Sequence, residues 1–288
     1  MLYRNFQTKA ELDAQYNPRE LGLDTNFYLE FYTYNSAQVR EQQVCKLNIP
    51  FGFTTVEHLD IFPTKNSKAP ILIFIHGGYW IMSSSKDFSF VAKAPVANGV
   101  TVVVVNYGLC PKVTIDEIVR QNRAAVAWVY QNAESFGGDP DRIYISGHSA
   151  GGHLTAMVMA TNWEKDYNLP ADVVKGGCLI SGLFDLMPFP YTWLQPKIQL
   201  TWDEAIRNSP IYHIPEKSGS LIITYGEDES EEFRRQSQDF LKAWKRKGLQ
   251  GEYLPQPGVN HFTAINGFLD VNSPLWIATS KLMNTFIL

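Results

Sequence analysis

The sequence predicts an α/β protein with a doubly wound, mostly parallel sheet and helices on both faces. Two observations carry this prediction. Short apolar runs of strand length alternate with helical patterns along the chain, which is typical of parallel sheets with crossover helices. Several of these runs are continuously apolar, as in strands buried on both faces. Because no repeat or low-complexity linker divides the chain, we expect a single domain over residues 1–288.

The expected strands are short runs rich in β-branched residues. In chain order they are ILIFI (71–75), TVVVV (101–105), RIYIS (142–146), GGCLIS (176–181), LIITY (221–225) and a last candidate, EYLPQ (252–256). Sheets of this kind bind ligands in the loops at the carboxyl ends of their strands. The loops that follow these runs are therefore the places to look for functional residues.

Amphipathic helices are expected between the strands. The clearest one begins after Thr114, which forms a capping box with Glu117, and ends at Gly137 and Gly138. Its apolar face consists of Ile115, Ile118, Val119, Val126, Val129 and Tyr130. A later helix is expected to end at Gly248, and its apolar stripe consists of Phe233, Phe240, Leu241 and Trp244.

Residues 186–205 fit no strand. The segment contains three prolines, two tryptophans and a tyrosine. We expect a small cap-like insertion that covers the edge of the sheet or a pocket. A loop packed by its own aromatic side chains is an equally good interpretation.

Composition excludes several classes of protein. The net charge is −4, from 25 basic and 29 acidic residues, which argues against a general nucleic-acid binder. The three cysteines, Cys45, Cys110 and Cys178, are far apart and form no disulfide framework or zinc spacing, so a reducing compartment is expected. No signal peptide is recognised, and no apolar run reaches the ~18 residues of a membrane span. These observations predict a cytoplasmic protein without a membrane partner.

The first functional motif is GHSAG (147–151), between the expected strand 142–146 and a helix. In this arrangement Ser149 sits on a sharp, strained turn that projects its hydroxyl from the top of the sheet. The flanking glycines keep side chains away from the tight approach. G-x-S-x-G alone is a weak signal, but its place between strand and helix makes Ser149 the candidate nucleophile.

The second motif, HGGYW (76–80), directly follows strand 71–75. Acyl transfer through a serine creates an oxyanion, which backbone N–H groups stabilise. Glycines let the backbone approach the substrate, so the candidate donors are the N–H groups of Gly78 and Tyr79 together with that of Ala150. The alternative interpretation is the glycine pair of an ordinary β-turn.

A serine nucleophile also needs a base. His261 lies on the loop after the last candidate strand, where the chain order of serine, acid and histidine places the base. His148, next to the nucleophile, is expected to point elsewhere. His76 and His153 are expected to be structural, and His58 and His213 have no motif context.

The acid must lie between Ser149 and His261, on the loop YGEDESEEF (225–233). Asp is the commoner residue in such triads and favours Asp228, but Glu229 is an accepted variant. Asp228 has a second interpretation as the N-cap of the following helix, a place that Ser230 could also take.

Several segments resemble the α/β-hydrolase fold and, within it, the kynurenine formamidase (arylformamidase) family. They are LDAQYNPR, HGGYW, GHSAGGHL, SGLFDL, EAIRNSP, ESEEFRRQSQDF and NHF, and they run from about Leu12 to His261. In this family the aromatic pair of HGGYW stands where related esterases have a third glycine. The family acid lies four residues before the phenylalanine of the next helix, which selects Glu229; this sequence departs from the pattern, because Asp is common there.

The resemblance implies a cofactor-free serine hydrolase that converts N-formylkynurenine into kynurenine and formate. Ser149, His261 and Glu229 would be its triad, and Tyr79, Trp80 and Trp193 could stack on the aryl ring. A carboxylesterase for small or aryl esters is the alternative, and a non-catalytic binding module is a third interpretation. No H-E-x-x-H or clustered ligand set predicts a metal. The expected partner is a small aromatic amide or ester, with no nucleic acid, and a homodimer stays open.

Overall fold

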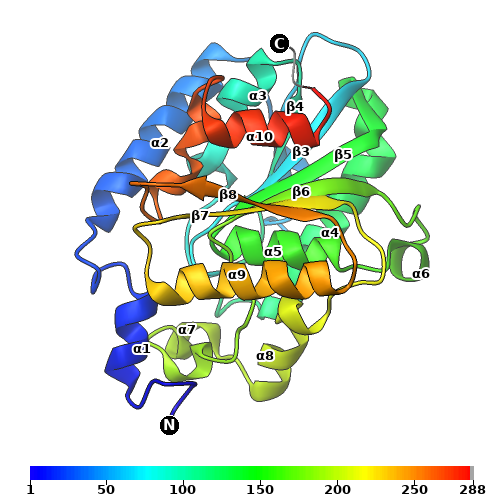
Figure 1. The fold of residues 1–288 in the computed structure, drawn as a ribbon. Helices are drawn as coiled ribbons and strands as arrows, with labels where there is room; N and C mark the ends of the chain where they lie inside the picture. Colours follow the sequence, from blue (N-terminus) through cyan, green and yellow to red (C-terminus); the bar gives the residue numbers. More distant parts are fainter. Residues whose placement is uncertain (286–288) are drawn as a thin grey trace.

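The computed structural model describes residues 1–285 as a central sheet of eight strands with helices on both faces (Figure 1). The strands lie in the order β1-β2-β4-β3-β5-β6-β7-β8. Only β2 runs antiparallel to its neighbours, β1 and β4; the strands from β4 to β8 are parallel. The strand bounds are β1 (Lys46–Pro50), β2 (His58–Phe62), β3 (Ala69–Ile75), β4 (Thr101–Val105), β5 (Gly138–His148), β6 (Val174–Ile180), β7 (Ser220–Gly226) and β8 (Gly251–Gln256).

Two apolar layers pack against the two faces of this sheet, and Figure 1 shows α2, α3 and α10 on one face and α4, α5 and α9 on the other. The α-helices are α1 (Lys9–Tyr16), α2 (Thr25–Gln42), α3 (Lys93–Ala97), α4 (Ile115–Asn132), α5 (Ala150–Met159), α6 (Trp163–Tyr167), α7 (Gln195–Ile198), α8 (Trp202–Arg207), α9 (Glu231–Arg246) and α10 (Pro274–Leu282). Short 3₁₀ helices are η1 (Ser85–Ala92), η2 (Ala133–Phe136), η3 (Phe189–Tyr191), η4 (Pro210–Tyr212) and η5 (Thr263–Leu269).

The six expected strands are confirmed as β3 to β8, although β5 begins four residues earlier than its apolar run. Two strands, β1 and β2, had no sequence prediction. β1 is an edge strand whose residues are nearly all exposed, so its sequence KLNIP carries no apolar pattern. In β2, HLDIF, the buried Asp60 accepts hydrogen bonds from Ser85 and Asn48, which hides a buried strand behind a charged residue.

The two expected helices are confirmed as α4 and α9, with differences at their caps. Thr114 Oγ1 accepts from the N–H of Glu117 at 3.3 Å, but the Glu117 carboxylate binds Arg120 and Gln121, so only half of the capping box forms. Asp228 does not cap α9. Ser230 occupies the N-cap position, and its hydroxyl donates to the carbonyl of Gln15 instead.

Residues 186–205 form η3, α7 and most of α8 rather than an irregular loop. They lie beside α1 at one end of the molecule (Figure 1). Phe189, Leu194 and Ile198 are buried, and the backbone N–H of Trp193 donates to Asp13 of α1 at 2.8 Å. The division into one domain with a cap insertion stays a prediction. Within residues 1–285, no helix has the length and apolar character to cross a membrane.

Candidate active site

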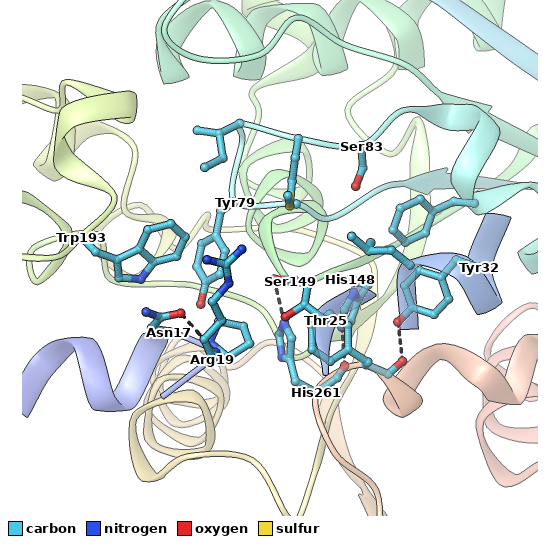
Figure 2. A pocket seen from close by; sticks show the side chains of 17 residues that line it. Asn17, Arg19, Thr25, Tyr32, Tyr79, Ser83, His148, Ser149, Trp193 and His261 are labelled. Carbon is cyan, nitrogen blue, oxygen red and sulfur yellow. Dashed lines mark hydrogen bonds between the residues drawn. The ribbon is translucent and has the colours of Figure 1, made fainter. Parts of the chain in front are cut away.

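Ser149 stands on a strained turn between β5 and α5. Its backbone has φ 58° and ψ −120°, a conformation that side-chain-bearing residues rarely adopt. The turn is possible because glycines flank it: a Cβ on Gly147 would lie 2.3 Å from the Gly151 carbonyl oxygen, and one on Gly151 would lie 2.0 Å from that of Ile75. The glycines of GHSAG therefore allow the close packing that points the Ser149 side chain into a pocket (Figure 2).

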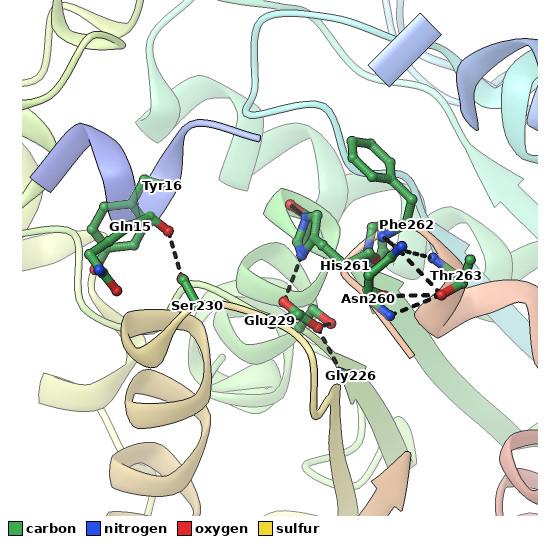
Figure 3. A network of polar contacts seen from close by, with 12 residues as sticks. Gln15, Tyr16, Gly226, Glu229, Ser230, Asn260, His261, Phe262 and Thr263 are labelled. Atoms are coloured by element: carbon green, nitrogen blue, oxygen red, sulfur yellow. Dashed lines mark hydrogen bonds and ion pairs between the residues drawn. The ribbon is translucent and has the colours of Figure 1, made fainter. Parts of the chain in front are cut away.

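A chain of hydrogen bonds joins the three residues expected from the motifs. His261 Nε2 lies 3.0 Å from Ser149 Oγ, and His261 Nδ1 lies 2.8 Å from Glu229 Oε2 (Figures 2 and 3). All three side chains are buried. They follow β5, β7 and β8, so parallel strands bring them to one edge of the sheet from positions up to 112 residues apart.

Glu229 is held from its other oxygen as well. Oε1 accepts from the Ser181 hydroxyl at 2.5 Å and from the Gly226 backbone N–H at 2.7 Å. The adjacent Asp228 is exposed, and its backbone N–H donates to the carbonyl of Val259. Of the two carboxylates, the structure brings Glu229 to the imidazole and leaves Asp228 toward solvent.

His148 belongs to the site, and the expectation that it points elsewhere is wrong. Its ring centre lies 4.7 Å from that of His261, and its Nε2 lies 2.8 Å from the His261 carbonyl oxygen. Burial lowers the pKa of His148 well below its usual range, and the neighbouring His261 lowers it further. The neutral ring therefore donates from Nε2 to that carbonyl. Its place beside Ser149 in the chain gave no sign of this contact, because the strained turn sets its direction.

The loop after β3 presents backbone donors beside Ser149. Within residues 1–285, the N–H groups of Gly78, Tyr79 and Ala150 donate to no protein acceptor. Gly78 has φ 108°, and a Cβ there would lie 2.3 Å from the Met82 carbonyl oxygen, so only glycine fits. These three N–H groups are the ones that the sequence predicts as oxyanion donors.

The aromatic pair of HGGYW divides between the pocket and the core. Tyr79 lines the pocket, its hydroxyl donates to the Tyr16 carbonyl, and its ring centre lies 5.7 Å from that of Trp193. Trp80 is fully buried, does not line the pocket, and donates from Nε1 to His153 Nδ1 at 3.2 Å. The prediction that Trp80 contacts the substrate is therefore wrong, because adjacent side chains of this tight turn point in different directions.

The loop that carries His261 is held by α2. The Tyr32 hydroxyl donates to the Phe262 carbonyl at 2.5 Å, and Asn260 Nδ2 donates to the Tyr28 hydroxyl at 2.8 Å. Tyr28 also stacks on Phe262, with ring centres 4.7 Å apart. The sequence motifs gave no indication that α2 supports the histidine loop.

The site opens into a cavity of about 240 Å³ whose walls are largely apolar (Figure 2). Its floor is formed by Ser149, His148 and His261. One wall comes from the N-terminal part of the chain and was not expected as part of the site; it consists of Asn17, Pro18, Arg19, Thr25, Leu29 and Tyr32. The only sequence signal for this wall was the resemblance of the LDAQYNPR segment, which ends at Arg19.

Residues 59–244 match the family model BD-FAE. The chain is 35% identical to a kynurenine formamidase of Salmo salar over 245 residues, which are 82% of this chain and 81% of that protein. It is 32% identical to a kynurenine formamidase of Danio rerio over 278 residues, 92% of this chain and 93% of that one. The chain belongs to the kynurenine formamidase family. The predicted family resemblance is confirmed.

Solved structures confirm the α/β-hydrolase fold for this member of the kynurenine formamidase family. A provisionally assigned thioesterase from Silicibacter sp. has a TM-score of 0.81 at 26% identity, covering 92% of this chain and 97% of its own. A Pyrobaculum calidifontis esterase has a TM-score of 0.73 at 19% identity, covering 96% and 97% of the two chains. The match to these curated relatives establishes that the chain is a hydrolase.

Proposed function

We propose that this hydrolase cleaves the N-formyl amide of an arylamine, with N-formylkynurenine as substrate and kynurenine and formate as products. The observation that carries the proposal is the continuous chain of hydrogen bonds from Ser149 Oγ through His261 to Glu229. Its Ser149 end lies beside three N–H groups that have no acceptor within the described residues. The names of the Salmo salar and Danio rerio relatives support the choice of substrate.

In the first step Ser149 Oγ attacks the formyl carbon while its proton passes to His261 Nε2. The imidazolium that forms is stabilised by Glu229, whose Oε1 is fixed by hydrogen bonds from Ser181 and Gly226. Negative charge that develops on the formyl oxygen is met by the N–H groups of Gly78, Tyr79 and Ala150. Each such donor contributes about 10²–10³ in rate, because it is already oriented when the charge appears.

In the second step the carbon–nitrogen bond breaks, and His261 gives its proton to the departing arylamine nitrogen. The formyl group stays on Ser149 as an ester. A water molecule then attacks this ester with His261 as base, formate departs, and the proton returns to Ser149 Oγ. The aryl ring would rest on Tyr79 and Trp193, whose rings meet edge to face in the wall of the cavity.

A carboxylesterase acting on small or aryl esters is the second candidate. The same residues would perform both reactions, and an esterase of Pyrobaculum calidifontis shares the fold. The test is the ratio of kcat/KM for N-formylkynurenine to that for phenyl acetate, with formate measured directly. We expect the formamide to be the better substrate; no formate above the uncatalysed background, with the ester hydrolysed, would select the esterase instead.

A further inference from the structure

The end of the cavity formed by Arg19, Asn17 and Trp193 is rich in hydrogen-bond donors that have no acceptor. Within residues 1–285, the guanidinium of Arg19 makes no hydrogen bond or ion pair although it lines the cavity. The indole N–H of Trp193 is buried and also lacks a partner. Asn17 uses its Oδ1 to accept the Arg19 backbone N–H at 3.2 Å, which leaves its Nδ2 as a donor. In Figure 2 these three side chains lie together on one side of Ser149 and His261.

Acidic side chains are absent from the walls of this cavity. Within residues 1–285, none of the residues that line it is Asp or Glu, and Asp228 and Glu229 line a separate hollow that shares Pro18 and His261 with it. Asp13 contacts Trp193, but its carboxylate already accepts the Trp193 backbone N–H at 2.8 Å and pairs with Lys9. Glu229 is engaged with His261, Ser181 and Gly226. Arg19, which is exposed and lines the cavity, therefore presents a cation that no carboxylate within residues 1–285 pairs with.

These donors define which group on a ligand would fit this end of the cavity. A buried N–H without an acceptor is destabilising, so the indole of Trp193 is better satisfied when a ligand brings an oxygen to it. A guanidinium binds a carboxylate through two parallel hydrogen bonds, and an amide N–H can add a third. A single carboxylate group provides enough lone pairs for all three side chains.

We propose that Arg19, Trp193 and Asn17 form a subsite for the carboxylate of the substrate. The inference rests on the proposed function, because N-formylkynurenine carries its carboxylate at the end of the acyl side chain that is ortho to the formamide that Ser149 attacks. The preferred substrates are thus aryl formamides or esters with a carboxylate at the end of a neighbouring side chain. Since no side-chain carboxylate lines the cavity, an α-ammonium group on the substrate is not needed for recognition.

The kinetic test compares N-formylkynurenine with formanilide, which has the same formamide but no carboxylate. Arg19→Gln should lower kcat/KM for N-formylkynurenine at least tenfold, mostly through KM, because one charge-assisted contact of about 1.5–3 kcal/mol is lost. The same variant should hydrolyse formanilide within about twofold of the wild-type rate. Arg246→Gln is the matched control, since it removes an exposed arginine of α9 that does not line the cavity.

A binding test distinguishes the proposed carboxylate subsite from the proposed formamidase reaction. Inhibition by 4-oxo-4-phenylbutanoate and by acetophenone is measured against hydrolysis of p-nitrophenyl acetate, which requires no formamide activity. We expect Arg19→Gln to weaken inhibition by the acid at least tenfold and to leave inhibition by the ketone unchanged. If the acid is not preferred by the wild type, or if both inhibitors respond equally, the subsite is refuted. If the acid responds as expected but no formamide is cleaved, the subsite stands and the proposed reaction fails.

Discussion

The two ends of the cavity are built in different ways. At the end that holds Ser149, His261 and Glu229, each side chain lies in the turn or loop that follows a parallel strand of the sheet. At the end that holds Arg19 and Trp193, the side chains come from segments outside the sheet, near α1 and η3. In the proposed function the sheet positions the reacting groups and the appended segments select the substrate, so the appended segments can change without disturbing the reaction.

A buried polar network joins the appended end to the rest of the protein. The Tyr16 hydroxyl donates to Glu232 at 2.7 Å, and Arg235 binds both oxygens of the same carboxylate at 2.6 and 2.8 Å. The Tyr3 hydroxyl donates to Asp185 at 2.7 Å. Burial raises the pKa of Tyr16 well above its usual range, and the charge of Glu232 raises it further, so the hydroxyl remains a donor.

The strongest test of the sheet-borne end is Ser149→Ala. We expect kcat to fall by about 10⁴-fold or more, because the nucleophile is lost, while the bonds that fix the rest of the site remain. Hydrolysis of a formamide and of an ester should fall together, since both use the same oxygen. Circular dichroism controls for folding. Full activity in this variant would rule out the serine mechanism at both substrates.

Substitution of two neighbouring carboxylates, one at a time, tests the end of the cavity that holds Ser149 more finely. Glu229→Gln should lower kcat by about 10³–10⁴-fold, because the imidazolium loses its stabilising charge and His261 its fixed tautomer. Asp228→Asn should change kcat less than about twofold, since Asp228 is exposed and does not contact His261. The reverse order of effects would transfer the role of the acid to Asp228.

Low pH should lower the stability of the protein through two buried histidines. Burial lowers the pKa of two histidines to about 4. One is His76, which begins the loop after β3, and the other is His153, which accepts a hydrogen bond from Trp80. In the unfolded chain these two histidines have a pKa near 6.5. Their contribution to the free energy of unfolding is therefore fully present above pH 6.5 and is lost as the pH falls toward 4.

Urea unfolding at pH 7 and pH 5 measures this loss. His76 and His153 together contribute about 4 kcal/mol to the decrease in the free energy of unfolding over that interval, at 1.36 kcal/mol per pKa unit, and the buried His148 acts in the same direction. In His153→Gln the decrease should be smaller by about 2 kcal/mol, because one titrating ring is gone, while His76 and the buried His148 remain. An unchanged decrease would mean that His153 does not contribute to the acid sensitivity.

The smallest expected effect comes from the network at the appended end. Tyr16→Phe removes a hydrogen bond to a buried carboxylate and should lower the free energy of unfolding by about 2 kcal/mol. Its KM for carboxylate substrates should rise while kcat for a neutral ester is kept, because Ser149 is untouched. Tyr34→Phe is the control, since Tyr34 is 66% exposed. Equal loss of kcat on both substrates would contradict the division into two ends.

The comparison also explains what the sequence could predict. The runs in β5 and β7 are apolar and mostly buried, and the segments with Ser149 and Glu229 follow them, so local patterns were enough to predict these two places. His261 follows β8, whose residues are largely exposed, and it was predicted from the chain order of serine, acid and histidine. The exposed strand β1 and the wall around Arg19 have no such local pattern, because long-range contacts define them. Trp80 and His148 were misjudged for a third reason: in turns with positive φ, the sequence does not show which way a side chain points.

The contact between Tyr32 and the Phe262 carbonyl spans 230 positions of the chain. Contacts of such separation carry a large loop-closure entropy and form late, after local helices and neighbouring strands. The histidine loop therefore reaches its working position only when α2, made early in synthesis, meets a segment made near the end. During refolding, secondary structure should return before hydrolytic activity, because activity requires the late contact between α2 and the loop that carries His261.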